Sequence, residues 1–84
     1  MSFELTTERK AENDSALVAY KAACLSGDIT AIWNTYAAVE QRMNSMGRLG
    51  LGAEYERVRI SMNKITRERR EARNAERHYA IAAE

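Results

Sequence analysis

The segment "LSGDI", residues 25–29, constrains the fold more than any other part of the sequence. Glycine readily takes the left-handed conformation that follows a helix, and aspartate is a preferred N-terminal cap. A helix that ends at Ser26-Gly27 is therefore followed at once by a helix that Asp28 caps. A connection this short makes two helices fold back beside each other. The sequence predicts a helical hairpin.

Apolar residues recur at helical spacing on both sides of this link. We expect Trp33 and Tyr36, beside Met43, to be ordinary core residues and not the aromatic lining of a ligand site. The first helix begins either after a Thr6 or Thr7 cap or within residues 12–15, where Asn13 or Asp14 offers a second cap. The predicted hairpin spans about residues 7–46. Its apolar faces are Leu17, Val18, Tyr20, Cys24 and Leu25 in the first helix, then Ile29, Ile32, Trp33, Tyr36, Val39, Met43 and Met46 in the second.

Residues 47–52 hold three of the four glycines and predict a turn, with Leu49 and Leu51 packing onto the hairpin. Their glycine spacing matches neither a dinucleotide-binding loop nor a P-loop. The chain has no proline, and residues 53–83 predict one long helix of about 45 Å at 1.5 Å per residue. Its apolar seam is Tyr55, Val58, Met62, Ile65, Ala72 and Tyr79, which is dense at first and then thin.

The hairpin helices have only about half the length of the third helix, so the basic end of that helix should project. The predicted fold class is all-α, with the helical hairpin packed against the first half of a long C-terminal helix. The 84 residues leave no room for a second core, so we expect a single domain over 1–84.

The net charge of +1 conceals an uneven distribution. Residues 57–77 carry eight basic groups, seven of them arginine, against three acidic groups. Arg69 and Arg73, and Arg73 and Arg77, are like-charged pairs at i, i+4 spacing, which destabilise an isolated helix. This arrangement indicates that groups outside the helix compensate the positive charges of the arginines. The competing interpretation is a solvated helix face.

Guanidinium groups make planar, paired contacts with carboxylate or phosphate. Three interleaved glutamates repel phosphate, and no aromatic cluster suited to stacking bases is present, so a protein partner is favoured over nucleic acid. A tyrosine among arginines is typical of an interface anchor. On a helical wheel the arginines that fall within roughly 60° of one another are Arg59, Arg70, Arg73 and Arg77. The predicted partner-binding residues are Arg59, Arg69, Arg70, Arg73, Arg77 and Tyr79.

We therefore expect a small non-enzymatic helical binding protein that docks on a larger protein or nucleoprotein assembly through its arginine-rich C-terminal helix. It would act as an adaptor, an inhibitor or a structural component. Such chains are common among phage and mobile-element accessory proteins. Two alternatives stay open: a nucleic-acid-binding protein that contacts phosphates with the same helix, and a homo-oligomeric particle component whose acidic half meets the basic helix of a neighbour.

The sequence offers no catalytic constellation. His78 is the only histidine, so a two-histidine metal site within one chain is excluded. Cys24 lies on an apolar helical face, where a buried thiol is inert. We expect no enzyme activity, no cofactor and no metal. No stretch reaches the roughly 18 apolar residues of a membrane span, and residues 1–10 lack a signal-peptide pattern. We expect a cytoplasmic protein without a membrane partner, in the host cytosol if a phage encodes it.

Overall fold

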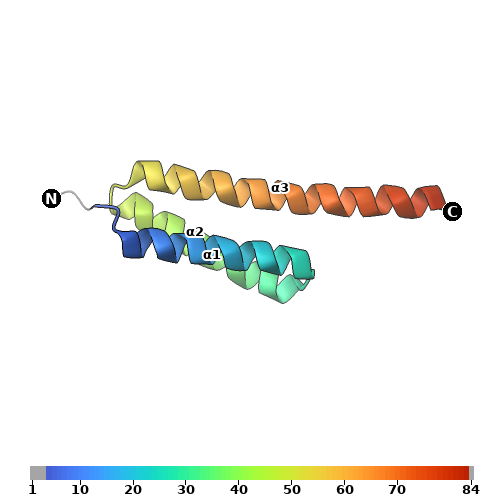
Figure 1. Cartoon of the computed structure of the whole chain (residues 1–84), viewed down its shortest axis with the longest axis horizontal. Coiled ribbons are helices and arrows are strands. Elements are labelled where there is room, and N and C mark those ends of the chain that lie inside the picture. The colour runs from blue at the N-terminus through green and yellow to red at the C-terminus, as the bar shows by residue number, and fades with distance from the viewer. Residues whose placement is uncertain (1–3, 84) are drawn as a thin grey trace.

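The computed structural model describes residues 4–83, with side chains described as far as Arg77. Three helices follow one another, α1 (Thr7–Ser26), α2 (Ile29–Arg48) and α3 (Gly52–Ala83), and each packs against the other two. The described residues form no strand. The molecule measures 62 × 20 × 17 Å, because α3 continues well past the end of the α1–α2 hairpin (Figure 1). The prediction of an all-α hairpin against a long helix is confirmed.

The helix ends follow the capping residues in the sequence. Thr6 caps α1, because its Oγ1 accepts a hydrogen bond of 3.1 Å from the backbone N–H of Arg9. Gly27 takes the left-handed conformation with φ of 76°, and Asp28 Oδ1 accepts from the backbone N–H of Thr30 at 3.0 Å. The predicted hairpin link is confirmed. Of the two predicted starts of the first helix, the earlier one is used, so Asn13 and Asp14 lie within α1.

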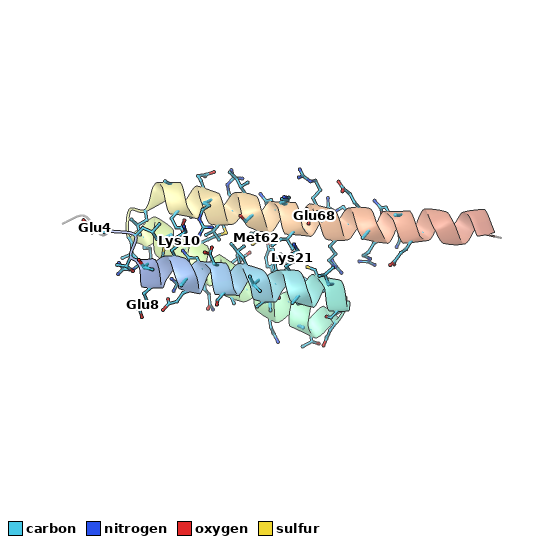
Figure 2. The ribbon with its side chains drawn as sticks, viewed as in Figure 1. Glu4, Glu8, Lys10, Lys21, Met62 and Glu68 are labelled. Atoms are coloured by element: carbon cyan, nitrogen blue, oxygen red, sulfur yellow. The ribbon has the colours of Figure 1, made fainter. Side chains whose placement is uncertain are left out.

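The core lies between the hairpin and the first half of α3. Val39, Met46 and Val58 are fully buried, and Met62 lies between α3 and the hairpin (Figure 2). Tyr20 packs its ring edge-to-face on Tyr36, with 5.7 Å between the ring centroids. The remaining members of the buried apolar cluster are Leu17, Ala23, Ile32 and Met43.

The prediction that Trp33 is a core residue is wrong, because 69% of its surface is exposed. Ile29 is also exposed, at 55%, and so are Val18, at 68%, and Leu25, at 81%, which were predicted on the apolar face of the first helix. The apolar arc of α2 spans roughly 140° on a helical wheel, and its two neighbours cover only part of that arc. Burial falls on the side of Ile32, Val39 and Met46, which leaves Ile29 and Trp33 beyond the covered edge.

A buried polar network joins the three helices near the start of α1. Asn13 is completely buried, and its Nδ2 donates to Glu54 Oε2 at 2.8 Å. Its Oδ1 accepts from Arg42 Nε at 2.8 Å. Glu54, only 4% exposed, also accepts from Arg57, and Arg57 forms a 2.9 Å ion pair with Asp14. Every buried side-chain nitrogen or oxygen among the described residues has a hydrogen-bond partner.

Near the other end of the hairpin, α1 is fastened to α3 by a second polar contact. The Tyr20 hydroxyl lies 2.7 Å from Thr66 Oγ1, and burial raises the pKa of this tyrosine. Ile65 is the last α3 residue that packs against the core cluster. The end of the hairpin lies beside the next turns of α3, and the rest of α3 continues past it (Figure 1). The prediction that the basic end projects therefore agrees with the arrangement of the helices.

Candidate interaction surface

The projecting part of α3 holds most of the arginines that the sequence indicated. α3 has 32 residues against 20 in each hairpin helix, a difference of about 18 Å at 1.5 Å per residue. Every described side chain from Arg70 to Arg77 is exposed. Ala72, Arg73 and Glu76 of this stretch line a hollow with residues at the end of the hairpin. The last turns of α3 continue past the end of the hairpin (Figure 1).

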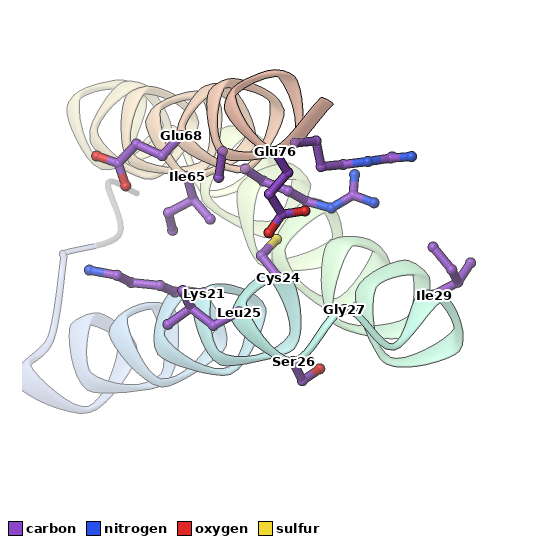
Figure 3. A pocket seen from close by; sticks show the side chains of 12 residues that line it. Lys21, Cys24, Leu25, Ser26, Gly27, Ile29, Ile65, Glu68 and Glu76 are labelled. Carbon is purple, nitrogen blue, oxygen red and sulfur yellow. The ribbon is translucent and has the colours of Figure 1, made fainter. Parts of the chain in front are cut away.

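Four arginines gather on one side of this segment. They line a shallow surface hollow together with two neutral polar residues, and no carboxylate contributes to it. We call this surface the arginine face; it consists of Thr66, Arg69, Arg70, Arg73, Asn74 and Arg77. The glutamates of the same segment lie on other sides of the helix. Glu68 is 4.0 Å from Lys64 Nζ, and Glu68 and Glu76 both point toward the α1 side (Figure 3).

The arginines of the arginine face differ in their ion pairing from Arg42, Arg57 and Arg59, and resemble Arg48 and Arg67, which also form no ion pair with a described carboxylate. Arg42 pairs with Glu12 at 2.9 Å, and Arg57 is bound by two carboxylates. The hydrogen bonds that Arg57 donates to Glu54 raise the pKa of Arg57. Among the described residues, none of the four arginines of the arginine face forms an ion pair. Their charges are therefore available to a second molecule.

A groove runs beneath α3 where the hairpin ends. Its floor comes from the turn between α1 and α2, where Leu25 is 81% exposed and Ile29 and Trp33 stand open to solvent. Its roof comes from α3. We call this surface the hairpin-end groove; it consists of Leu25, Ile29, Trp33, Arg69, Ala72 and Arg73. Figure 3 shows Leu25 and Ile29 on either side of Gly27, below the glutamates of α3.

The groove and the arginine face share two residues. Arg69 and Arg73 line the arginine face on one side and stand beside Ile29 and Trp33 on the other. They are four residues apart in α3, so they lie on the same side of the helix, one turn from each other. An apolar surface and a cationic surface therefore form one continuous region at the end of the hairpin.

The structure brings together four of the six residues predicted to bind a partner. Arg69, Arg70, Arg73 and Arg77 all belong to the arginine face. Arg59 stands apart, about 15 Å nearer the start of α3 than Arg69 at 1.5 Å per residue. It forms a 2.6 Å ion pair with Glu56, which lowers the pKa of that carboxyl. Tyr79 lies outside the residues whose side chains the structure describes.

Trp33, Ile29 and Leu25 are the surface residues that sequence reasoning missed. Their apolar character placed them in the predicted core. For Ile29 and Trp33, the signal that could have found them is the width of the apolar arc on α2, of which the neighbouring helices bury only one side. The second signal is position, because all three lie near the Gly27 turn, where the hairpin ends and α3 is the only helix left beside them.

Few side chains around the hairpin-end groove could act as a nucleophile or bind a metal ion. Cys24 is half-buried and lines the α1 side of the groove beside Glu76 (Figure 3). No group of three or more histidine, cysteine, aspartate or glutamate side chains is placed to hold a metal ion in the part of the chain that the structure describes. Within the same residues, no helix combines the length and apolar character needed to cross a membrane.

The chain matches no family model, and neither a curated protein nor a solved structure is significantly similar to it. Its function therefore has to be inferred from its own residues.

Proposed function

We propose that this protein is a non-catalytic binding protein, an adaptor, inhibitor or structural component, that docks on a larger protein or nucleoprotein assembly through the arginine face of α3. The observation that carries the proposal is the gathering of four arginines on one side of the second half of α3, in a hollow to which no carboxylate contributes. Among the described residues, no carboxylate forms an ion pair with these four arginines.

The energetics of an isolated helix support this proposal. Helical segments shorter than about 12–15 residues are marginal in water. Each like-charged pair at i, i+4 destabilises such a helix by about 0.2–0.5 kcal/mol, and Arg69, Arg73 and Arg77 make two such pairs. Carboxylates of a partner would remove this repulsion and would add charge-assisted hydrogen bonds. Binding and helix stability are therefore coupled in this segment.

A charge-neutralised variant tests the proposal. Replacing Arg70, Arg73 and Arg77 with glutamine removes three charges while keeping good helix formers in place. The matched control replaces Arg48, Lys64 and Arg67, which lie outside the arginine face, with glutamine. Both tagged variants are incubated with nuclease-treated extract of the source cells, and the retained proteins are quantified by mass spectrometry.

We expect the arginine-face variant to lose the partner that the original chain retains, and the control variant to keep it. Equal retention by the two variants would contradict the proposal, because three charges on that face would then contribute nothing. Circular dichroism of both variants checks that the helical content is unchanged.

Nucleic acid is the second candidate, favoured by the same absence of carboxylates from the arginine face. Anisotropy of a labelled DNA duplex and of a labelled RNA strand, measured over a range of salt, separates the two. Four phosphate contacts would give a log–log salt slope of about −3 to −4. A protein partner would show a weaker dependence on salt, because apolar contacts contribute to its binding.

A further inference from the structure

We infer that the partner presents an acidic amphipathic helical segment, which seats a bulky apolar side chain in the hairpin-end groove and places carboxylates on Arg69 and Arg73. This inference rests on the proposed function and extends it, because it adds residues of the hairpin to the contact and states the chemistry of the occupant. The inference is drawn from the apolar surface and the cationic surface that meet in the groove.

The apolar floor is the first step. Trp33 is 69% exposed and Ile29 is its neighbour one turn earlier in α2. The hollow that they line with Tyr20, Tyr36 and the two arginines has a volume of about 460 Å³. This volume is enough for a large apolar side chain and the backbone that carries it. Tryptophan and arginine are also the residues that most often dominate binding energy at protein interfaces.

The cationic roof is the second step. Arg69 is half-buried and lines the groove. Neither Arg69 nor Arg73 forms an ion pair with a described carboxylate. A partner segment with acidic residues three or four positions apart on a helix would match their spacing on α3. Charge complementarity thus specifies an acidic occupant.

The setting of the groove favours a protein segment over nucleic acid. Glu68 and Glu76 line its α1 side, close to the same arginines (Figure 3). A continuous polyanion crossing the groove would meet these carboxylates, whereas a protein segment can carry its acids at separate positions. The exposed Leu25 offers a phosphate no favourable contact. An amphipathic helix, by contrast, can contact the leucine and the arginines at once.

The ion pairs of α1 also favour a segment of another protein over a second copy of this chain as the occupant of the groove. The acidic residues of α1 that could serve a neighbouring arginine face are partly engaged within the chain. Glu12 pairs with Arg42 at 2.9 Å, and Asp14 pairs with Arg57 at 2.9 Å. Leu17, Tyr20 and Ala23 of α1 are turned into the core. A second copy would have to break these contacts to present an acidic amphipathic segment.

A peptide-display selection tests the inference, with the intact chain as bait. The probe is a yeast-displayed library of 18-residue helical peptides in which acidic, basic and apolar residues are equally available at each position. Enriched peptides are synthesised and titrated against the chain. Trp33 is the only tryptophan, so its fluorescence reports directly on the floor of the groove, provided that the peptides contain none.

The expected result is an enriched pool in which acidic residues outnumber basic ones and bulky apolar residues recur at i, i+3 or i+4. Binding should shift Trp33 emission to shorter wavelength. Trp33→Ala and Arg73→Glu should each weaken binding about tenfold or more. The matched controls are Ile60→Ala, which removes another exposed apolar side chain, and Arg67→Glu, which reverses a charge outside the arginine face. Both controls should bind within about twofold of the original chain.

Four results would overturn the inference. The first is an enriched pool without an acidic excess, and the second is a pool whose affinity does not change with Trp33→Ala. The third is a DNA or RNA strand of 18 nucleotides that binds more tightly than any selected peptide. The fourth is a solution mass of twice 9.5 kDa whose formation shifts Trp33 emission, which would make a second copy the occupant.

The outcomes also distinguish this inference from the proposed function. Peptides that depend on Arg70 and Arg77 but not on Trp33 would leave the arginine face as a protein-binding surface and remove the groove from it. Selected peptides that depend on none of the arginines would contradict both proposals.

Discussion

Replacing Asn13 with alanine is predicted to destabilise the fold more than any other single change at a polar side chain of the described chain. Asn13 is completely buried and exchanges hydrogen bonds of 2.8 Å with one charged group on each of the other two helices. Hydrogen bonds to charged groups contribute about 1.5–3 kcal/mol each, and leaving their partners partly unsatisfied adds to the cost. Glu54 retains Arg57 and Arg42 retains Glu12, so part of the loss is offset.

We therefore expect Asn13→Ala to lower the free energy of unfolding by about 2–4 kcal/mol. For a chain of 84 residues, stability of about 0.05–0.15 kcal/mol per residue gives a total of roughly 4–13 kcal/mol. The loss is thus a large fraction of the whole. At roughly 4–8 °C for each kcal/mol in a domain of this size, Tm should fall by about 8–32 °C.

Urea and thermal unfolding followed by circular dichroism at 222 nm measure this change. The matched control is Asn63→Ala, which makes the same substitution at an exposed position of α3. Alanine is the better helix former there, so stability should stay within about 0.5 kcal/mol or rise. A loss below about 1 kcal/mol for Asn13→Ala, or a loss equal to that of the control, would refute the assignment of this network as the main polar constraint on the fold.

Two further predictions concern the same fold. The hydrogen bonds that Arg57 donates, followed by the one from Asn13, hold the pKa of Glu54 below its ordinary value of 4.5. The contribution of Glu54 to stability is therefore present above that value and is lost as pH falls through the lowered pKa. As pH falls from about 6 to about 3, the urea midpoint of Glu54→Gln should decrease less steeply than that of the original chain, and equal slopes would contradict this. Trp33→Ala should change the free energy of unfolding by less than about 1 kcal/mol, whereas Met46→Ala should lower it by about 2–5 kcal/mol; comparable losses in thermal unfolding would mean that Trp33 is buried after all.

The parts of the fold that local chemistry determines could be predicted from the sequence. Gly27 and Asp28 act within one turn of themselves, so the hairpin link follows from two residues. The projection of α3 follows from counting helical positions on either side of the glycines. The arginine face follows from helical periodicity, since Arg70, Arg73 and Arg77 keep to one side of any helix that contains them.

The parts that depend on how helices pack could not be predicted. Asn13 and Glu54 are 41 residues apart, and their contact exists only because two helices meet at one height and rotation. Sequence reasoning regarded Asn13 as a candidate cap, which is its usual role. The prediction that Trp33 is a core residue was wrong for a related reason. The periodicity of α2 is correct for a helix, but the edge of the buried arc is set by where α1 and α3 lie and not by α2 itself.

The two polar contacts between α1 and α3 have a consequence for recognition. Asn13 meets Glu54 near the start of α1, and Tyr20 meets Thr66 near the end of the hairpin. Together they oppose sliding of α3 along α1 by a helical turn, which would move every α3 side chain by about 5.4 Å. Such a slip would carry Arg73 away from Trp33. These contacts thus set the distance between the cationic and apolar parts of the binding surface, and a shift in the register of α3 against α1 would change its specificity without changing the identity of any contact residue.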